Sequence, residues 1–324
     1  MKAVVCKKYG APEVMKIKEV NKPEVKDNDV LIKIKSSTIS PVDCAFRKGN
    51  PFVSRLFTGL KRPKHIPGDI ISGVIEAVGK KVTRFKVGDE VFGHTGLEFG
   101  AHSEYLASHE DEAIILKPSE MTFDEAAAVA YSAMTALPFL KDHVKIDKNT
   151  HILINGASGA IGTFAIQIAK HFGAKVTAVC GSSNIEMVKD IGADHVVDYT
   201  KDDFTTHLNS FDIIFDVVGK SSYSKSKYAL KKEGVYLTTA PDFGAVIHMM
   251  TLSRLKSKKA KFVATGLRKV PQKIEDLNYL TELYKNGQIN SVIDQSFVLD
   301  DIIKAHTYVD KGHSKGNVIL ILDQ

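Results

Sequence analysis

The chain has 324 residues, 44% of them hydrophobic and 25% charged, a composition typical of a globular protein of two domains. Lysine and arginine exceed aspartate and glutamate by 44 to 38. The densest basic run, Lys256–Lys261, contains no aromatic residue, so we interpret it as a solvated loop. We therefore expect no nucleic-acid partner. No segment has the length of a membrane helix or of a signal peptide's apolar core, so we expect a cytoplasmic protein without a membrane partner. The three cysteines are widely separated and form no CxxC pair, which excludes a disulfide framework.

The first 125 residues have the patterning of β-structure. Isoleucine alternates with lysine in Val30–Lys35, which is the two-residue period of a half-buried strand. Short apolar runs follow at Gly73–Val78 and Glu90–Phe92, separated by glycine-containing turns. This part of the chain therefore predicts a compact, mostly antiparallel, barrel-like domain.

From residue 126 to residue 266 the pattern changes to alternating helices and strands. An alanine-rich stretch, Ala126–Leu140, is too short to span a bilayer and predicts a buried helix. The β-branched runs and amphipathic segments that follow predict a parallel sheet with right-handed crossovers. The expected strands are His151–Gly156, Lys175–Cys180, His195–Tyr199, Phe211–Gly219, Val235–Ala240 and Lys261–Gly266, and the expected helices are Gly159–Phe172, Asn184–Ile191 and Tyr223–Lys232.

The tail, residues 267–324, is too small to fold alone and is expected to complete the first domain. It predicts a helix over Lys273–Lys285 with one apolar face, made by Ile274, Leu277, Leu280 and Tyr284. Further elements are expected in the order strand, helix, strand, at Ser291–Leu299, Asp300–Lys311 and Asn317–Leu322.

The most informative segment is HILINGASGAIG, at residues 151–162. An apolar strand runs into Gly156, Gly159 and Gly162 and then directly into a helix, an order far more specific than glycine spacing alone. Glycine permits a tight turn and lets backbone N–H groups approach a diphosphate, while the helix N-terminus supplies partial positive charge. A glycine turn used only for packing is the alternative, but the strand–helix–strand context favours a dinucleotide site.

The end of the next strand bears on which dinucleotide is bound. An NAD-specific domain usually carries an acidic residue there for the ribose hydroxyls, whereas this chain has Cys180 followed by Gly181, Ser182 and Ser183. A carboxylate at that place would repel a 2′-phosphate, so its absence favours NADPH. No arginine stands there either, so NADH is the less favoured alternative.

Several motifs occur in a fixed order along nearly the whole chain: VLIKIKSSTISPVDCAFRKG, IPGDIISGVIEAVGKKVTRFKVGDEVFG, GAHSEY, NGASGAIG, IGADHVVDY, FDVVG and KGNVIL. In this the chain resembles the medium-chain dehydrogenase/reductase superfamily, and within it the zinc-independent quinone oxidoreductase and enone reductase branch. The resemblance implies an α/β fold, with a GroES-like β-barrel catalytic domain at 1–125, completed by 267–324, and a Rossmann doubly wound parallel-sheet domain for NADPH at 126–266. It also implies a homodimer that forms along an edge near Val235–Gly266.

The resemblance also bears on zinc. Zinc-dependent relatives have a cysteine near the end of the SPVDC segment, a histidine after the glycine of IPG and a cysteine in the helix before the Rossmann fold; here the last two places are held by Asp69 and Tyr131. Cys44 alone would be a single ligand, and a catalytic zinc needs three from the protein, so we expect no metal. Replacement ligands are the alternative, from His65, His94 or His102.

Carried over residue by residue, the resemblance implies a set of cofactor contacts. The diphosphate would be lined by Ser158, Gly159, Ala160 and Ile161, and the 2′-phosphate by Ser182, Ser183 and Tyr199. Thr135 would contact the nicotinamide, Val218 would lie at the cofactor rim, and Asn317, where many relatives have lysine, would reach in from the tail.

The expected reaction is a reduction. Without a metal to polarise an alcohol, hydride transfer to an activated acceptor is the easier direction, so we expect NADPH to reduce an enone or a quinone, with Tyr131 as the candidate proton donor. Phe52–Leu60 and Phe243–Leu255 are expected to line a pocket for a small hydrophobic carbonyl or quinone. The alternatives are a zinc-type alcohol dehydrogenase with unusual ligands and a protein that binds NADPH without efficient catalysis.

Overall fold

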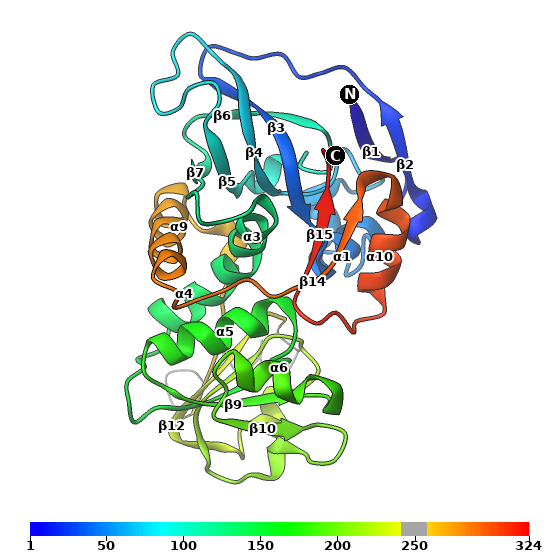
Figure 1. The fold of residues 1–324 in the computed structure, drawn as a ribbon. Coiled ribbons are helices and arrows are strands. Elements are labelled where there is room, and N and C mark those ends of the chain that lie inside the picture. Colours follow the sequence, from blue (N-terminus) through cyan, green and yellow to red (C-terminus); the bar gives the residue numbers. More distant parts are fainter. Residues whose placement is uncertain (241–257, 324) are drawn as a thin grey trace. The chain divides into compact units, whose positions relative to one another are not determined.

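The computed structural model describes residues 1–240 and 258–323, and the chain divides into two compact units (Figure 1). The first unit comprises Met1–Tyr131, Leu267–Lys285 and the chain from Ser291 onward, and the second comprises Ser132–Gly266 with Asn286–Asn290. The last of these segments, predicted as part of the first domain, is held in the second unit by Gln167. Its side chain donates to the carbonyl of Asn290 at 3.0 Å and accepts from the amide of Asn290 at 2.7 Å.

The first unit contains a seven-stranded sheet built from both ends of the chain. Its central strand, β3 (Asp29–Thr38), pairs with β4 (Ile70–Val78), β6 (Tyr105–His109) and β15 (Asn317–Ile321). The sheet continues on one side with β5 (Glu90–His94) and β7 (Ala113–Leu116) and on the other with β14 (Ile293–Val298). Only the β14–β15 pair is parallel. The sheet is thus mostly antiparallel, as predicted, and β15 from the tail pairs with β3 at its centre.

A separate hairpin in the first unit, β1 (Lys2–Cys6) with β2 (Met15–Glu19), was not predicted. Lysines and glutamate outnumber the apolar residues in β2, and only Met15 in that strand is buried. The hairpin is instead held through β1, whose Val4 amide donates to the carbonyl of His102 at 3.0 Å. The helices of this unit are α1 (Pro41–Lys48), α2 (Ser54–Thr58), α3 (Phe123–Ala128), α9 (Val270–Lys285) and α10 (Ile302–Asp310).

The alanine-rich stretch forms a continuous helical path with one irregularity. α3 passes through a π-helical turn, Val129–Ala133, into α4 (Met134–Asp142). Such turns interrupt a regular helix by one extra residue and are common at functional sites. Tyr131, the candidate proton donor, lies in the middle of this turn. No helix in the described part of the chain is long and apolar enough to cross a bilayer.

The second unit is built on a six-stranded, fully parallel sheet in the order β10-β9-β8-β11-β12-β13. This is the doubly wound order, in which the chain starts in the middle and adds strands first to one side and then to the other. The strands are β8 (His151–Asn155), β9 (Lys175–Cys180), β10 (His195–Asp198), β11 (Phe211–Asp216), β12 (Leu230–Thr238) and β13 (Lys259–Phe262). The predicted parallel sheet is confirmed.

Two local predictions for the second unit were wrong. α5 (Ala160–His171) and α6 (Ile185–Asp190) form where expected, but the helix predicted over Tyr223–Lys232 is only one turn, α7 (Tyr223–Ser226). Leu230 is fully buried and pairs with Phe211, so strand pairing replaces the helical periodicity. Lys256–Lys261 is not simply a solvated loop, because its last three residues belong to β13 and Lys261 donates to the carbonyl of His143 at 2.6 Å.

Candidate functional site

The glycine-rich turn follows β8 at the carboxyl edge of the parallel sheet. β8 is the strand at which the order switches sides, with β9 on one flank and β11 on the other. Open α/β sheets bind ligands in the crevice outside the carboxyl ends of the strands at this switch point. The topology therefore places the predicted dinucleotide motif where such folds bind dinucleotides.

The three glycines of the turn differ in why the fold needs them. Gly156 has a φ of +84°, and a Cβ on it would lie 2.3 Å from Cγ1 of Val218. A Cβ on Gly162 would lie 2.2 Å from the carbonyl oxygen of Gly156, so α5 packs directly on the turn. Beside Gly159, by contrast, the nearest atom to a built Cβ is 3.4 Å away. Among residues 1–240 and 258–323, no neighbour requires glycine at this position, but a ligand approaching the backbone closely would.

The start of α5 has the properties of an anion site. Gly159 is the N-cap and provides no capping side chain, and Ala160 and Ile161 begin the helix. The first amides of a helix point outward and carry partial positive charge, and side chains usually cap them. An uncapped helix start beside an open glycine therefore fits a diphosphate group.

A buried carboxylate, Asp216, organises the loop that faces the turn. It lies at the end of β11 and accepts hydrogen bonds from the backbone amides of Val218, Gly219 and Ser221, at 3.0–3.2 Å. These bonds hold Val218, the predicted rim residue, in the position where it contacts Gly156.

Two side chains complete the shell around Asp216. Asn155, at the end of β8, donates its amide at 3.0 Å, and the hydroxyl of Tyr236 donates at 2.8 Å. Sequence reasoning did not identify Asp216. Its signal is a carboxylate that ends the otherwise apolar strand FDIIFD immediately before the predicted rim residue.

The predicted 2′-phosphate contacts lie together at the ends of β9 and β10. Ser182 and Ser183 follow β9, and Tyr199 follows β10, with its hydroxyl 3.2 Å from where a Cβ on Gly181 would lie. Asn184 donates its side-chain amide to the hydroxyl of Ser158 at 3.1 Å, which ties this loop to the glycine turn. The structure thus brings the predicted 2′-phosphate contacts and the glycine-rich turn to the same edge of the parallel sheet.

The same cluster contains a carboxylate that the sequence argument had not considered. Asp198, the last residue of β10, accepts from the hydroxyl of Ser182 and from the amide and hydroxyl of Thr200, the last two at 3.0 and 2.7 Å. These hydrogen bonds lower the pKa of Asp198 to about 2, so the group is charged at neutral pH. The end of β9 at Cys180 carries no acidic residue, and this charge comes instead from the end of the next strand, β10.

The remaining predicted residues are divided between the units. Thr135 lies on α4 in the second unit and is half-buried. Tyr131 and Asn317 belong to the first unit. Asn317 is buried, and its side-chain amide donates to the carbonyl of Val292 at 3.1 Å, which holds the start of β15.

In the first unit, the half-buried Tyr131 is part of a polar cluster. Its phenol forms a hydrogen bond with Ser40, the residue that caps α1. Burial, together with the nearby carboxylates of Asp43 and Asp69, raises the pKa of Tyr131 despite the bond to Ser40. The phenol is therefore protonated at neutral pH and can act as a hydrogen-bond or proton donor.

Asp69, at the place where zinc-dependent relatives have a histidine, has a partner within the protein. His94 Nδ1 accepts from the amide of Gly96 at 2.8 Å, so its Nε2 carries the proton and contacts the Asp69 carboxylate at 3.1 Å. Burial alone would raise the pKa of Asp69, but the pairing with His94 and the positive charge of Lys273 hold it below its usual range.

The other candidate ligands are engaged separately. His102 Nε2 donates to the carbonyl of Thr38 at 3.1 Å, His65 stacks on Phe99 at 5.7 Å between ring centres, and the Cys44 sulfur lies 3.4 Å from Nδ1 of His306. Over residues 1–240 and 258–323, no three His, Cys, Asp or Glu side chains are grouped as a metal site would require. The side chains that the structure places here do not fit a zinc ion.

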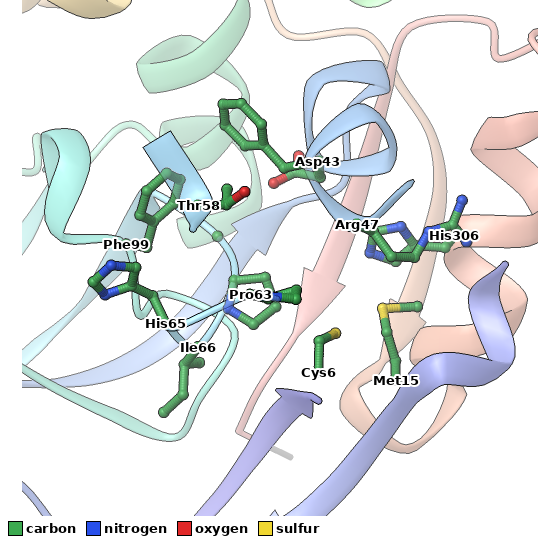
Figure 2. Close-up of a pocket in the computed structure, with 13 residues that line it drawn as sticks. Cys6, Met15, Asp43, Arg47, Thr58, Pro63, His65, Ile66, Phe99 and His306 are labelled. Atoms are coloured by element: carbon green, nitrogen blue, oxygen red, sulfur yellow. The ribbon is translucent and has the colours of Figure 1, made fainter. Parts of the chain in front are cut away.

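Figure 2 shows a small cavity in the first unit, lined by side chains from α1, α10, the β1–β2 hairpin and the segment before β4. Its volume is about 30 Å³, enough for one or two water molecules and too small for a quinone. From the predicted acceptor segment Phe52–Leu60, only Thr58 lines it, while Phe52 and Leu56 are exposed. The other predicted segment, Phe243–Leu255, lies outside the described residues.

Comparison with known proteins agrees with this architecture. Residues 26–119 match the alcohol dehydrogenase GroES-like domain family, and residues 191–320 match the zinc-binding dehydrogenase family. The quinone oxidoreductase of Coxiella burnetii superposes with a TM-score of 0.88 at 27% identity, covering 100% of this chain and 99% of that one. The GroES-like and Rossmann architecture implied by the sequence motifs is confirmed.

Curated relatives are similar over nearly the whole chain. The 2-methylene-furan-3-one reductase of Solanum lycopersicum is 32% identical over 99% of this chain and 79% of its own length. The chloroplastic NADPH-dependent alkenal/one oxidoreductase of Arabidopsis thaliana is 30% identical over the same shares. Full-length similarity at this level, with the fold and both domain families, shows that the chain belongs to the medium-chain dehydrogenase/reductase superfamily, in the branch of quinone oxidoreductases and enone reductases.

Proposed function

We propose that this protein is an oxidoreductase that transfers hydride from NADPH to a quinone or to an α,β-unsaturated carbonyl compound. The observation that carries the proposal is the glycine turn at the switch point of the parallel sheet, with an uncapped helix start and open space beside Gly159. The names of the enone-reducing and quinone-reducing relatives support the same reaction class.

The chain's own residues have separable tasks in this reaction. The amides at Ala160 and Ile161 would hold the diphosphate, and the loop fixed by Asp216 would support the cofactor rim through Val218. When bound, the reduced nicotinamide supplies the hydride. The protein orients the acceptor, excludes water and supplies the proton that the acceptor oxygen needs, for which Tyr131 remains our candidate.

We propose NADPH rather than NADH as the preferred cofactor, and a reaction that needs no zinc. The hydroxyls of Ser182, Ser183 and Tyr199 would meet the 2′-phosphate. Asp198 is the opposing charge in this cluster. The pairing of Asp69 with His94 and of Tyr131 with Ser40 supports a reaction without zinc, because these side chains already bond to protein partners instead of being available to a metal ion.

Removal of the Asp198 charge tests where the 2′-phosphate lies. In Asp198→Asn, we expect the Kd for NADPH to fall about two- to five-fold at low salt while the Kd for NADH stays unchanged, because only NADPH brings a like charge to this place. Fluorescence titration of both cofactors measures this. Asp202→Asn is the matched control, since Asp202 is exposed and pairs with His207. Equal shifts for both cofactors would place the 2′-phosphate elsewhere.

The function itself is tested by a panel of quinones and enones, assayed with NADPH and NADH side by side in the presence of EDTA. We expect acceptor-dependent NADPH oxidation that EDTA leaves unchanged. Loss of activity with EDTA would support the zinc-dependent alternative. Cofactor binding with no turnover on the whole panel would identify a binding protein without catalysis.

Two further expectations belong to this proposal. A homodimer would form along β13, the edge strand of the parallel sheet, on which Phe262 is 41% exposed. A cytoplasmic location remains our proposal from composition. Sedimentation velocity of the purified protein tests the first, and localisation of a tagged chain tests the second.

A further inference from the structure

Ser40 and Asp43, which cap the start of α1, are also linked to the candidate proton donor Tyr131. Ser40 and Asp43 form a reciprocal capping box: the amide and the hydroxyl of Ser40 donate to Asp43 Oδ2 at 2.8 and 2.5 Å, and the Asp43 amide donates to the Ser40 hydroxyl at 3.3 Å. The Tyr131 phenol is hydrogen-bonded to the same Ser40 hydroxyl. Phenol, hydroxyl and carboxyl therefore form one continuous chain of hydrogen bonds.

A second capping box in the same unit provides a comparison. Thr122 and Glu125 cap α3 with the same reciprocal bonds, at 2.8–3.2 Å. That pair is at the surface, whereas Ser40 and Asp43 are buried. A carboxylate is costly to bury for capping alone, because an amide side chain or water would satisfy the same helix end more cheaply. The burial of Asp43 thus points to a role for its proton.

The charges around Asp43 favour its protonated form. Burial and then the negative charge of Asp69 raise the pKa of Asp43 to about 7. Arg47 and Cys44 share its helix, His65 and Asp69 face it from the segment before β4, His306 from α10 and Tyr131 from the π-helical turn. Of these, Arg47 is committed to Asp310 at 2.5 Å, and burial lowers the pKa of His306 to about 3, so His306 is neutral.

Asp43 also borders a space that can hold water. It lines the 30 Å³ cavity together with Arg47 and His306 (Figure 2). In the part of the chain that the structure describes, Nε and Nη1 of Arg47 and Nε2 of His306 are buried without a protein hydrogen-bond partner. Buried polar groups of this kind are normally satisfied by ordered water, and the cavity has room for it.

We propose that Asp43 is the proton reservoir of the reaction: it passes its proton through Ser40 to Tyr131, which protonates the reduced acceptor, and it is reloaded by water in the cavity. This rests on the proposed function. Hydride adds two electrons to the acceptor and leaves an oxyanion. For this transfer the protonated Asp43 carboxyl donates to the Ser40 hydroxyl and the Ser40 hydroxyl donates to Tyr131, the reverse of the bond that Ser40 donates to a charged Asp43 carboxylate. The Tyr131 O–H bond breaks as the acceptor O–H bond forms, Tyr131 takes the Ser40 proton, and Ser40 takes the Asp43 proton. A proton from bulk solvent, passed on by the cavity water, then reloads the Asp43 carboxylate, so each turnover consumes one hydride and one solvent proton.

The relay predicts a specific pH dependence. The donor form of Asp43 is present below pH 7 and is lost as the pH rises, so kcat for enone reduction by the wild type falls above about pH 7. In Ser40→Ala and Asp43→Asn, kcat at pH 6 should fall about 10- to 100-fold and lose its dependence on pH between 6 and 8, while KM for NADPH stays unchanged. Ser40→Thr retains a hydroxyl and should restore both the rate and the pH profile.

Glu125→Gln is the matched control, because it makes the same carboxyl-to-amide change in the other capping box. It should keep the wild-type rate and pH profile, and the melting temperatures of all variants show which remain folded. An active wild type with unchanged pH profiles in Ser40→Ala and Asp43→Asn would overturn the relay alone. Equal losses of kcat in Asp43→Asn and Glu125→Gln would mean that Asp43 only caps the helix and is not a proton reservoir. A wild type that reduces no acceptor would overturn the proposed function and the relay with it.

Discussion

Replacement of Gly162 by alanine is expected to destabilise the second unit and to abolish tight NADPH binding. The new Cβ would lie 2.2 Å from the carbonyl oxygen of Gly156 and 2.8 Å from Cα of Ala157. Both are backbone atoms, so neither can rotate away and α5 must shift from the turn. Overpacking of this kind typically costs about 1–3 kcal/mol, which thermal unfolding detects as a lower melting temperature. Because the displaced helix start is the proposed diphosphate site, the Kd for NADPH should rise more than about ten-fold.

Gly159→Ala separates cofactor binding from folding. Its Cβ would meet no atom of the described part of the chain closer than 3.4 Å, so the melting temperature of the apoprotein should stay at the wild-type value. The methyl group would occupy the space through which the diphosphate approaches the backbone, so NADPH binding should weaken about ten-fold or more. Gly266→Ala is the control, because Gly266 has no positive φ and its Cβ would have no atom of the described residues within 4 Å. If Gly159→Ala binds NADPH like the wild type, the turn does not hold the diphosphate.

Asp216→Asn should be among the most destabilising volume-conserving changes in the second unit. The new NH₂ group can take the place of only one oxygen: at Oδ1 it would face the amides of Asn155, Val218 and Gly219, and at Oδ2 the amide of Ser221 and the hydroxyl of Tyr236, which alone of these can accept. In either orientation at least one buried backbone amide loses its acceptor. Leaving buried donors without an acceptor typically costs about 1–3 kcal/mol for each neutral group and more for a charged network, so we expect a loss of about 3–5 kcal/mol in the free energy of unfolding. Chemical denaturation measures it.

The same strand offers a control for this change. Asp212, on β11, has a side chain 37% exposed and pairs with Lys231 at 2.8 Å. Asp212→Asn should therefore cost less than about 1 kcal/mol. Near-equal losses in the two variants would mean that the buried hydrogen-bond shell does not stabilise the site. Because the shell also fixes Val218, Asp216→Asn should weaken NADPH binding under conditions where the variant remains folded.

The sequence predicted those features that repeat at short range. The alternation in β3, the order of strands and helices around β8 and the glycine turn each depend on residues that are close in the chain. The helix predicted over Tyr223–Lys232 failed for the opposite reason: Leu230 fits a helical period locally, but its burial against Phe211 depends on a strand that precedes it by nearly twenty residues.

The parts of the site that sequence reasoning missed are contacts between distant segments. Asp216 accepts from Asn155 across 61 positions, and Asp198 accepts from Ser182 across 16. Nothing in the residues around Cys180 indicates that a carboxylate from the next strand lies beside Ser182. The bond between Ser40 and Tyr131 likewise joins the start of α1 to a helical turn some ninety residues later. Motifs in the sequence predict a cofactor site at one edge of the sheet. The charged groups at that edge come from segments that only the fold brings together.

The central claim, hydride transfer from NADPH held at the glycine turn without a metal, is tested most directly by isotope tracing. The metal-stripped protein would be given NADPH that carries deuterium at the transferable position of the nicotinamide, together with an enone, and the product would be analysed by mass spectrometry. We predict one deuterium at the β-carbon of the saturated product. A product without deuterium, or reduction that occurs only after zinc is restored, would contradict the account.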